Sequence, residues 1–252
     1  MKPFYEDEAA TLYLGDYRDV LPEIESADHA IFDPPYSEHV HASVRSAKML
    51  ANDRGGKYGS DTRRNVDLGF EHLADRDRDF LAAHIARIVS RWTLVFSDAE
   101  SSHLWRESLE AVGLDYVRTG AWVKVGSTPQ FSGDRPATGF EAVTIAHPKG
   151  RKRWNGGGKH AVWSVPIVLK RSRLQERNHP TEKPLSLMRA LVEEFTDPGE
   201  VILDMTAGSG TTGIAAKETG RRAVLIERDE KHAETAARRL SECQPLDLGA
   251  LA

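Results

Sequence analysis

The amino-acid sequence predicts an α/β fold built on a largely parallel sheet. Short hydrophobic strands alternate with amphipathic helical segments along most of its 252 residues, a pattern that places helices over a parallel sheet. Two of the expected strands run directly into turns rich in proline or glycine, at Asp33–Tyr36 and Asp204–Gly213. A chain of this length fits one large domain, or one domain with an inserted subdomain.

Composition narrows the classes of protein to which this chain can belong. Its formal net charge of −4 gives no overall sign of nucleic-acid binding, so any such surface must be local. No stretch reaches the roughly 20 apolar residues that span a bilayer, and acids occupy the N-terminal positions where a signal peptide has its apolar core. We therefore expect a cytoplasmic location and no membrane partner. The single cysteine, Cys243, excludes an internal disulfide and a cysteine-built metal site, and we expect no metal.

The first elements follow from runs of apolar residues and from their spacing. Short apolar runs indicate strands, whereas apolar residues that recur every three or four positions indicate a helix. Ser37–Asp75 shows little period of either kind, and a loop that long is usually functional, so we expect it to be mobile. The expected elements are strands at Thr11–Leu14, His29–Phe32 and Trp92–Phe96, a short helix at Tyr17–Ile24 and an amphipathic helix at Arg78–Arg91.

The second half of the chain continues the alternation. A basic stretch, Lys149–Arg177, interrupts it with nine Lys or Arg residues against one acid, a net charge of +8. The expected elements are helices at His103–Val112, from Pro184, from Thr211 and at the end of the chain, and strands near Tyr116–Val125, Phe140–Ala146, Val201–Leu203 and Ala223–Ile226.

The glycine-rich turn after the strand at Val201–Leu203 has the form of a ligand site. A strand, a glycine turn and a helix N-terminus expose backbone N–H groups to a ligand. Glu227 ends the following strand, 19 residues after Gly208. A carboxylate at this position can accept hydrogen bonds from both hydroxyls of a ribose. Gly208–Gly213 also satisfies GxGxxG, so a dinucleotide enzyme is an alternative, as is a tight turn without a ligand.

Asp33-Pro34-Pro35-Tyr36 is more informative, because it follows a hydrophobic strand and therefore lies where ligands bind in open α/β sheets. A carboxylate and a carbonyl fixed by prolines can accept hydrogen bonds from both N–H groups of an aryl amine. These hydrogen bonds make the amine nitrogen a better nucleophile. The tyrosine ring can stack on an extruded base. The alternative is a strand exit stiffened by proline, with a surface acid and a packed tyrosine.

Three motifs together resemble the β class of amino-directed DNA methyltransferases. They are Asp33-Pro34-Pro35-Tyr36, His179-Pro180-Thr181-Glu182-Lys183-Pro184 and Gly208-Ser209-Gly210-Thr211-Thr212, in that order. In that family the catalytic motif precedes the cofactor motif because the fold is circularly permuted. The resemblance covers nearly the whole chain and implies a Rossmann-like class I sheet of seven strands, one of them antiparallel, that binds S-adenosylmethionine.

The resemblance also implies a division of the chain and a role for each motif. Residues 1–148 would form the catalytic half with the loop 37–75, 149–178 a target-recognition insert, and 179–252 the cofactor-binding half. Asp33 and the carbonyl of Pro34 would hold the target amine, with Pro35 fixing the turn and Tyr36 stacking on the base. The implied cofactor-binding residues are Asp16, Asp33, His179, Thr181, Lys183, Asp204, Ala207, Gly208, Ser209, Gly210, Thr211, Thr212, Glu227 and Arg228.

One position departs from the family pattern. The family carries Asp-Pro-Phe before the glycines, and this chain carries Asp204-Met205-Thr206. Losing the proline and the aromatic ring could loosen the loop or expose the sulfonium side of the cofactor. The departure therefore bears on cofactor affinity, and it is the one feature that favours a non-catalytic DNA-binding relative.

The basic stretch occupies the interval that holds the recognition region in the family. Lys and Arg neutralise phosphates, and Trp or Arg can stack on bases or reach their edges. The alternative is a solvated loop with two core tryptophans. The candidate DNA-binding residues are Lys149, Arg151, Lys152, Arg153, Trp154 and Lys159, together with Arg63 and Arg64 in the long loop.

The choice of target base rests on chemistry and on the resemblance. Methylation of cytosine C5 needs an active-site thiol, and Cys243 lies in the C-terminal segment, far from Asp33 in sequence. The same motif serves adenine N6 and cytosine N4, and an Asp in first position favours adenine within the family. We expect double-stranded DNA as partner, a homodimer, and either no further partner or a separate restriction endonuclease.

Overall fold

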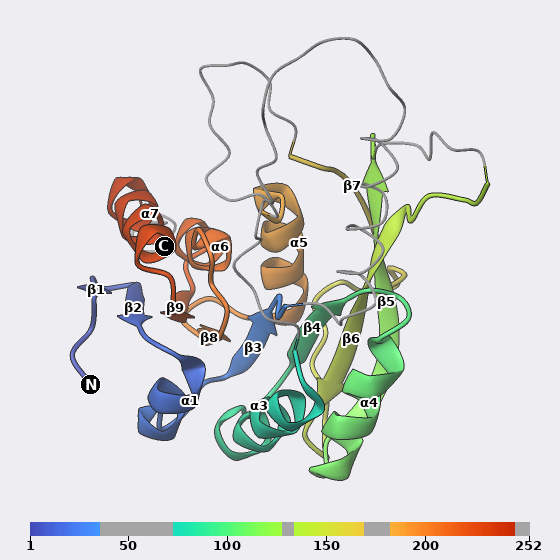
Figure 1. Cartoon of the computed structure of the whole chain (residues 1–252), viewed down its shortest axis with the longest axis horizontal. Helices are drawn as coiled ribbons and strands as arrows, with labels where there is room; N and C mark the ends of the chain where they lie inside the picture. Colours follow the sequence, from blue (N-terminus) through green and yellow to red (C-terminus); the bar gives the residue numbers. More distant parts are fainter. Residues whose placement is uncertain (36–72, 128–133, 169–181, 245–252) are drawn as a thin grey trace, which may run out of the picture.

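The computed structural model describes residues 1–35, 73–127, 134–168 and 182–244. These residues form a nine-stranded sheet in the order β1-β2-β9-β8-β3-β4-β6-β5-β7, with helices on both faces (Figure 1). The strands are β1 (Tyr5–Glu6), β2 (Ala10–Leu14), β3 (His29–Phe32), β4 (Thr93–Ser97), β5 (Asp115–Val125), β6 (Phe140–His147), β7 (Val162–Pro166), β8 (Val201–Asp204) and β9 (Arg222–Glu227).

The sheet confirms the predicted α/β class and extends it by two strands. Strands β2, β9, β8, β3 and β4 are parallel, and β6 is antiparallel to both β4 and β5. The expectation of seven strands with one antiparallel was incomplete, because β1 adds an antiparallel edge strand and β7 pairs with β5 in parallel at the other edge. β1 is only two residues long, and β7 lies within the stretch interpreted as an insert.

The pairing joins the two ends of the chain. Strands β8 and β9 come from its last quarter, yet β8 pairs with β3 and β9 pairs with β2, both from its first 35 residues. This is the spatial arrangement that the circular permutation predicted. As a consequence, the turns after β3 and β8 leave the sheet side by side at one edge, which we call the carboxyl edge.

Helices cover the sheet in two groups (Figure 1). One apolar cluster packs α5, α6 and α7 against one face, and a second packs α1, α3 and α4 against the other. None of the described helices combines the length and apolar character that crossing a membrane requires. The helices are α1 (Tyr17–Val20), α3 (Asp75–Ile88), α4 (Ser102–Ala111), α5 (Leu185–Phe195), α6 (Thr211–Glu218) and α7 (Glu230–Glu242).

Two predicted helices differ from the observed ones by more than a single residue at an end. The segment expected as one helix at Tyr17–Ile24 divides into α1 and a 3-10 turn at Leu21–Glu23, which contains Pro22 in its first turn. Proline lacks the N–H that a continuing α-helix needs. Helix α3 begins at Asp75 rather than Arg78, because two acids in its first turn complement the helix dipole before the apolar stripe starts.

The ring of Phe195 lies among three tryptophans in the core. Its ring lies 5.3 Å from Trp92, 4.7 Å from Trp154 and 6.3 Å from Trp163, measured between centroids, so it joins the sheet to the basic stretch. Phe195→Ala should lower the free energy of unfolding by about 3–5 kcal/mol, measured by urea denaturation. Phe4→Ala is the control, because Phe4 is 41% exposed. Equal small losses in both variants would contradict this account of the core.

Candidate functional site

Two carboxylates meet at the carboxyl edge of the sheet. Asp33 follows β3, Asp204 ends β8, and these strands pair in parallel with Ala30 opposite Leu203. Carboxyl ends of neighbouring parallel strands are the usual ligand-binding place in an α/β sheet. The predicted catalytic carboxylate and the predicted cofactor loop are therefore neighbours.

The glycine-rich turn is held by the side chain that precedes it. Asp204 accepts hydrogen bonds from the backbone N–H of Thr206 (3.0 Å) and from the hydroxyl of Thr212 (2.6 Å), so it closes the turn onto helix α6. Gly210 precedes α6 with φ of 78°, in the left-handed region that favours glycine. A Cβ at Gly213 would lie 2.6 Å from Leu225, so glycine also permits the close approach of α6 to β9.

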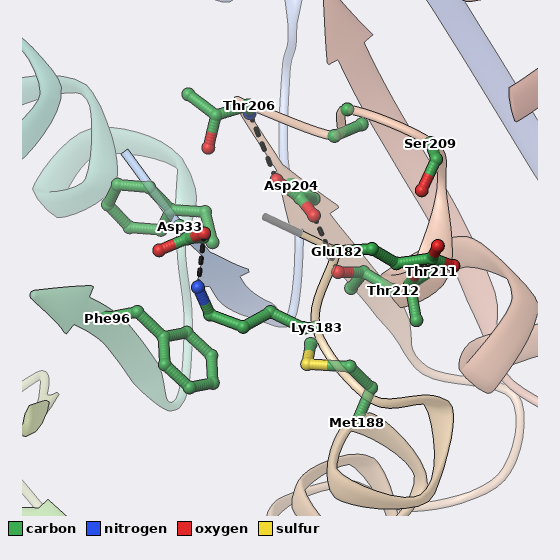
Figure 2. Close-up of a pocket in the computed structure, with 13 residues that line it drawn as sticks. Asp33, Phe96, Glu182, Lys183, Met188, Asp204, Thr206, Ser209, Thr211 and Thr212 are labelled. Carbon is green, nitrogen blue, oxygen red and sulfur yellow. Dashed lines mark hydrogen bonds and ion pairs between the residues drawn. The ribbon is translucent and has the colours of Figure 1, made fainter. Parts of the chain in front are cut away.

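A pocket of about 440 Å³, including its open side, lies between Asp33 and this turn (Figure 2). Eight of the residues that line it are predicted site residues: Asp33, Lys183, Asp204, Ala207, Gly208, Ser209, Thr211 and Thr212. The other five were not among the predicted cofactor-binding residues, although Glu182 lies in the His179–Pro184 motif and Thr206 in the departure from the family pattern: Phe32, Phe96, Glu182, Met188 and Thr206. Phe32 is the last residue of β3 and Phe96 the last but one of β4, and this position at the carboxyl edge is the signal that could have identified them.

Lys183 contacts the catalytic carboxylate directly. Its ammonium forms an ion pair with Asp33 and a second one with Glu141 (3.1 Å), and Glu141 also pairs with Lys124 (2.6 Å). The ammonium also lies over the ring of Phe96, 5.0 Å from its centroid. Burial lowers the pKa of Lys183, but the two carboxylates outweigh burial and hold this pKa above its ordinary value. A cation is thus fixed against Asp33 and favours its ionised form.

Asp204 has the opposite electrostatic balance. Its side chain is buried, and the desolvation that burial causes raises its pKa to about 7. The hydrogen bonds from Thr212 and from the N–H of Thr206 only partly offset this effect, and the charges of Asp33 and Glu227 add to it. The carboxyl group next to the pocket therefore changes charge near neutral pH.

A second ion pair ties the segment before α5 to the glycine-rich turn. Glu182 pairs with Arg239 (2.9 Å), and Arg239 also donates to the carbonyl of Ser209 (2.6 Å). Arg239 lies on α7, where nothing in its helical spacing distinguishes it from a solvated arginine. The contact fixes one wall of the pocket from a helix that sequence reasoning did not connect with it.

Other predicted cofactor residues lie at the same edge without lining this pocket. Glu227 ends β9 and accepts the N–H groups of Gly208 (2.7 Å) and Asp229 (2.8 Å). Each carboxylate oxygen keeps a second lone pair, so these bonds do not exclude a ligand hydroxyl. Asp16 follows β2 beside Glu227 and caps α1 by accepting the N–H of Arg18 (2.8 Å). Gly210 and Arg228 do not line the pocket either.

The predicted catalytic prolines lie beside the pocket. Pro34 and Pro35 line a neighbouring cavity of about 290 Å³, which Trp105 also lines. No group of His, Cys, Asp or Glu that could hold a metal occurs within the described ranges. The predicted residues that lie outside the described ranges are Tyr36, Arg63, Arg64, His179 and Thr181.

The basic stretch does not start near the pocket. Strand β6 runs antiparallel to β4, with Ala146 opposite Thr93, so its last residues lie at the edge remote from Asp33. Lys149 and Arg151 follow there and are exposed. Lys152 pairs with Asp115 at the start of β5 (2.8 Å). For these residues, position does not support contact with DNA that presents a base to Asp33.

The two tryptophans of the stretch are packed. Trp154 stacks edge-on against Phe195 and donates to the carbonyl of Gly157 (2.8 Å), while Trp163 is buried on β7. Two further cations of the stretch are in ion pairs, Arg153 with Asp197 (3.2 Å) and Lys159 with Glu194 (2.9 Å). These contacts favour packing of the two tryptophans in the core over stacking of either ring on a DNA base.

Comparison with known proteins gives consistent results. The model of the DNA methylase family N6_N4_Mtase matches residues 92–238. The type II methyltransferase M2.LlaDCHI of Lactococcus lactis subsp. cremoris is 27% identical to this chain, and the alignment covers 96% of this chain and 93% of that enzyme. The crystal structure of the M1.HpyAVI–SAM complex has a TM-score of 0.66 at 23% identity, covering 92% of this chain and 98% of that one. The cytosine-N4-specific PvuII DNA methyltransferase has a TM-score of 0.70 at 15% identity, covering 94% and 88%.

The charge of Asp204 generates a prediction about stability. Its folded-state pKa of about 7 lies above the ordinary value of 3.8, so the unfolded chain ionises first as pH rises. The free energy of unfolding should therefore fall between about pH 4 and pH 7, with about 2 kcal/mol of the loss above pH 5.5, at about 1.4 kcal/mol per pH unit. Asp204→Asn lacks this ionisable group. Between pH 5.5 and pH 8 its free energy of unfolding should therefore fall by about 2 kcal/mol less than that of the wild-type protein, measured by urea denaturation. The same pH dependence in both proteins would refute the assignment.

Proposed function

Because this chain belongs to the DNA methylase family of N6 and N4 methyltransferases, we propose that it transfers a methyl group from S-adenosylmethionine to the exocyclic N6 amine of adenine in DNA. The observation that carries the proposal is the placement of Asp33, paired with a buried lysine, beside a pocket walled by the Asp204–Thr212 turn. Membership in the family supports a DNA methyltransferase. The base, the cofactor contacts and the mechanism are the parts proposed here.

The pocket residues fit this cofactor. S-adenosylmethionine carries positive charge on its sulfonium and its ammonium group, and Asp33 and Asp204 supply carboxylates at the pocket wall. The hydroxyl oxygen of Thr206 is buried at this wall and has no hydrogen-bond partner in the described part of the chain, so a polar ligand can satisfy it. When bound, the cofactor supplies an electrophilic methyl group.

The proposed chemistry of the chain is to prepare the amine. The ionised Asp33 and the carbonyl of Pro34 accept the two N–H bonds of the target amine, which draws its nitrogen toward tetrahedral geometry and raises its nucleophilicity. Lys183 maintains the charge on Asp33 that this role requires. With the cofactor bound, the nitrogen would attack the methyl carbon directly, without a covalent enzyme intermediate. The carbon–sulfur bond would break, S-adenosylhomocysteine would leave, and Asp33 can accept the proton that the methylated amine loses.

An amine inside a duplex cannot reach Asp33, because that carboxylate lies in a pocket at the end of a strand. We therefore propose that the target nucleotide rotates out of the helix, as base-modifying enzymes require. Stacking of the base on Tyr36 stays a prediction, as do a homodimer, a separate restriction endonuclease and a cytoplasmic location.

Cytosine N4 is the second candidate target. The PvuII enzyme, which is cytosine-N4-specific, shares this fold, so the fold alone is compatible with either amine. The Asp in first position of the Asp33–Tyr36 motif favours adenine, by the resemblance to the family.

The test is to incubate the protein with DNA and labelled S-adenosylmethionine, digest the DNA to nucleosides and identify the product by mass. N6-methyladenine is expected. N4-methylcytosine would replace the proposed base and leave the mechanism intact. A folded protein that labels no nucleoside on any DNA would overturn the proposal.

Asp33→Ala tests the catalytic carboxylate. Removing a preorganised group that acts on the transition state costs about 100- to 1,000-fold in kcat, and we expect a loss of that size in methyl transfer. Asp19→Asn removes an exposed carboxylate on α1 and should keep wild-type activity. Circular dichroism would verify that both variants are folded. A near wild-type rate in Asp33→Ala would remove this residue from the mechanism.

Lys183→Met tests the cation that holds Asp33. Without the ammonium, ionised Asp33 is less favoured, so kcat should fall and the acidic limb of the pH–rate profile should move to higher pH by about 1 unit or more. Lys183→Arg, which keeps the charge, should restore part of the rate.

Lys217→Met is the matched control, because Lys217 is equally buried and pairs with Asp7, away from the pocket. It should lower stability without moving the pH–rate profile. An unchanged profile in Lys183→Met would show that the lysine is only a structural member of the core.

A further inference from the structure

The side chain of Thr206 is polar, but it makes no hydrogen bond within the described part of the protein. Its side chain lines the pocket, and its hydroxyl oxygen is buried without a hydrogen-bond partner in the ranges that the structure describes. Buried hydroxyls are normally hydrogen-bonded, because leaving one unpaired costs free energy. Figure 2 shows the hydroxyl oxygen of Thr206 on the side of the residue toward Asp33, so a ligand held between Asp33 and the glycine-rich turn can supply the missing partner.

The neighbouring residues hold the backbone of Thr206 in place. Met205 is 1% exposed and packs in the cluster that contains α3 and α4, which anchors the chain just before Thr206. The N–H of Thr206 donates to Asp204 (3.0 Å), which fixes its backbone. With the preceding side chain in the core and the backbone held, Thr206 presents its side chain to the pocket, where a hydroxyl stands in place of the aromatic ring of the family pattern.

The position within the pocket indicates which part of the ligand the hydroxyl meets. Figure 2 shows Thr206 on the side of the pocket toward Asp33, whereas Ser209 and Thr211 lie on the opposite side. In the proposed reaction, Asp33 holds the target amine, and reacting atoms must approach to within about 3–3.5 Å before transfer. The group nearest Asp33 on the cofactor side is therefore the methyl-bearing sulfur.

We propose that the Thr206 hydroxyl oxygen contacts the methyl-sulfonium centre of S-adenosylmethionine and makes the pocket selective for the charged sulfur. The inference rests on the proposed function and deepens it. A hydroxyl oxygen presents lone pairs to the positive sulfur and to the C–H bonds that this sulfur polarises. The same lone pairs meet no positive charge on the sulfur of S-adenosylhomocysteine. Thr206 thus discriminates the methyl donor from its demethylated product.

The experiment is calorimetric titration of the full chain with S-adenosylmethionine and, separately, with S-adenosylhomocysteine. The variant is Thr206→Val, which replaces the hydroxyl by a methyl group of similar volume. The dissociation constant for S-adenosylmethionine should rise about 5- to 10-fold, which is the size of the effect of losing one ordinary hydrogen bond. The constant for S-adenosylhomocysteine should stay within about twofold, as the contact requires a positive sulfur.

Thr93→Val is the matched control. Thr93 also has a buried hydroxyl without a hydrogen-bond partner in the described ranges, but it begins β4, at the edge remote from Asp33. Thr93→Val should leave both dissociation constants unchanged. Thr206→Ser retains the hydroxyl and should keep most of the wild-type preference for the charged ligand, which separates the hydroxyl from simple filling of space.

The outcomes separate this inference from the proposed function. If the wild-type protein binds neither compound, the proposed function and this inference fail together. If the wild-type protein binds both and Thr206→Val weakens neither, the inference alone is overturned. Equal weakening of both compounds also overturns it, because the hydroxyl would then contact a part that the two share.

Discussion

The ion pair between Lys183 and Asp33 is the contact on which the rest of the site depends. Asp33 follows β3 in the first half of the chain, and Lys183 lies two residues before α5 in the second. The pair therefore connects the two permuted halves at the carboxyl edge, where strand pairing alone would leave two carboxylates next to a pocket. Burying a charge is tolerated only when it is paired, and Lys183 serves both Asp33 and Glu141.

Asp204 shows what happens at the same edge without a cation. It is closed in by Thr212 and by the turn that it caps, and its pKa rises to about 7. The fold thus pairs one carboxylate with a buried ammonium group and leaves a second carboxylate, whose pKa is raised, on the neighbouring strand. Environments that push two acids apart in this way are typical of functional sites, since a purely structural edge would gain stability from neutral side chains.

The sequence predicted those parts of the molecule whose signals are local. Strand β3 and the turn after β8 were recognisable because an apolar run ends in a motif that only a backbone turn or a ligand explains. Glu141 and Arg239 were not, because the partners that give them meaning come from other elements. In a strand and a helix, each is an ordinary charged residue, and only tertiary pairing brings them to the pocket.

The basic stretch illustrates the same limit in the opposite direction, and it bears on where DNA can lie. Charge and tryptophan content predicted a nucleic-acid surface, but the antiparallel course of β6 takes Lys149–Arg153 to the edge remote from Asp33. Composition carries no information about which edge a segment reaches; strand direction does. A duplex that delivers a base to Asp33 has to approach the carboxyl edge, where β5 ends at Val125, β6 begins at Phe140 and β7 ends at Pro166. The described residues at these three strand ends, rather than Lys149–Arg153, therefore lie on the same side of the sheet as the pocket.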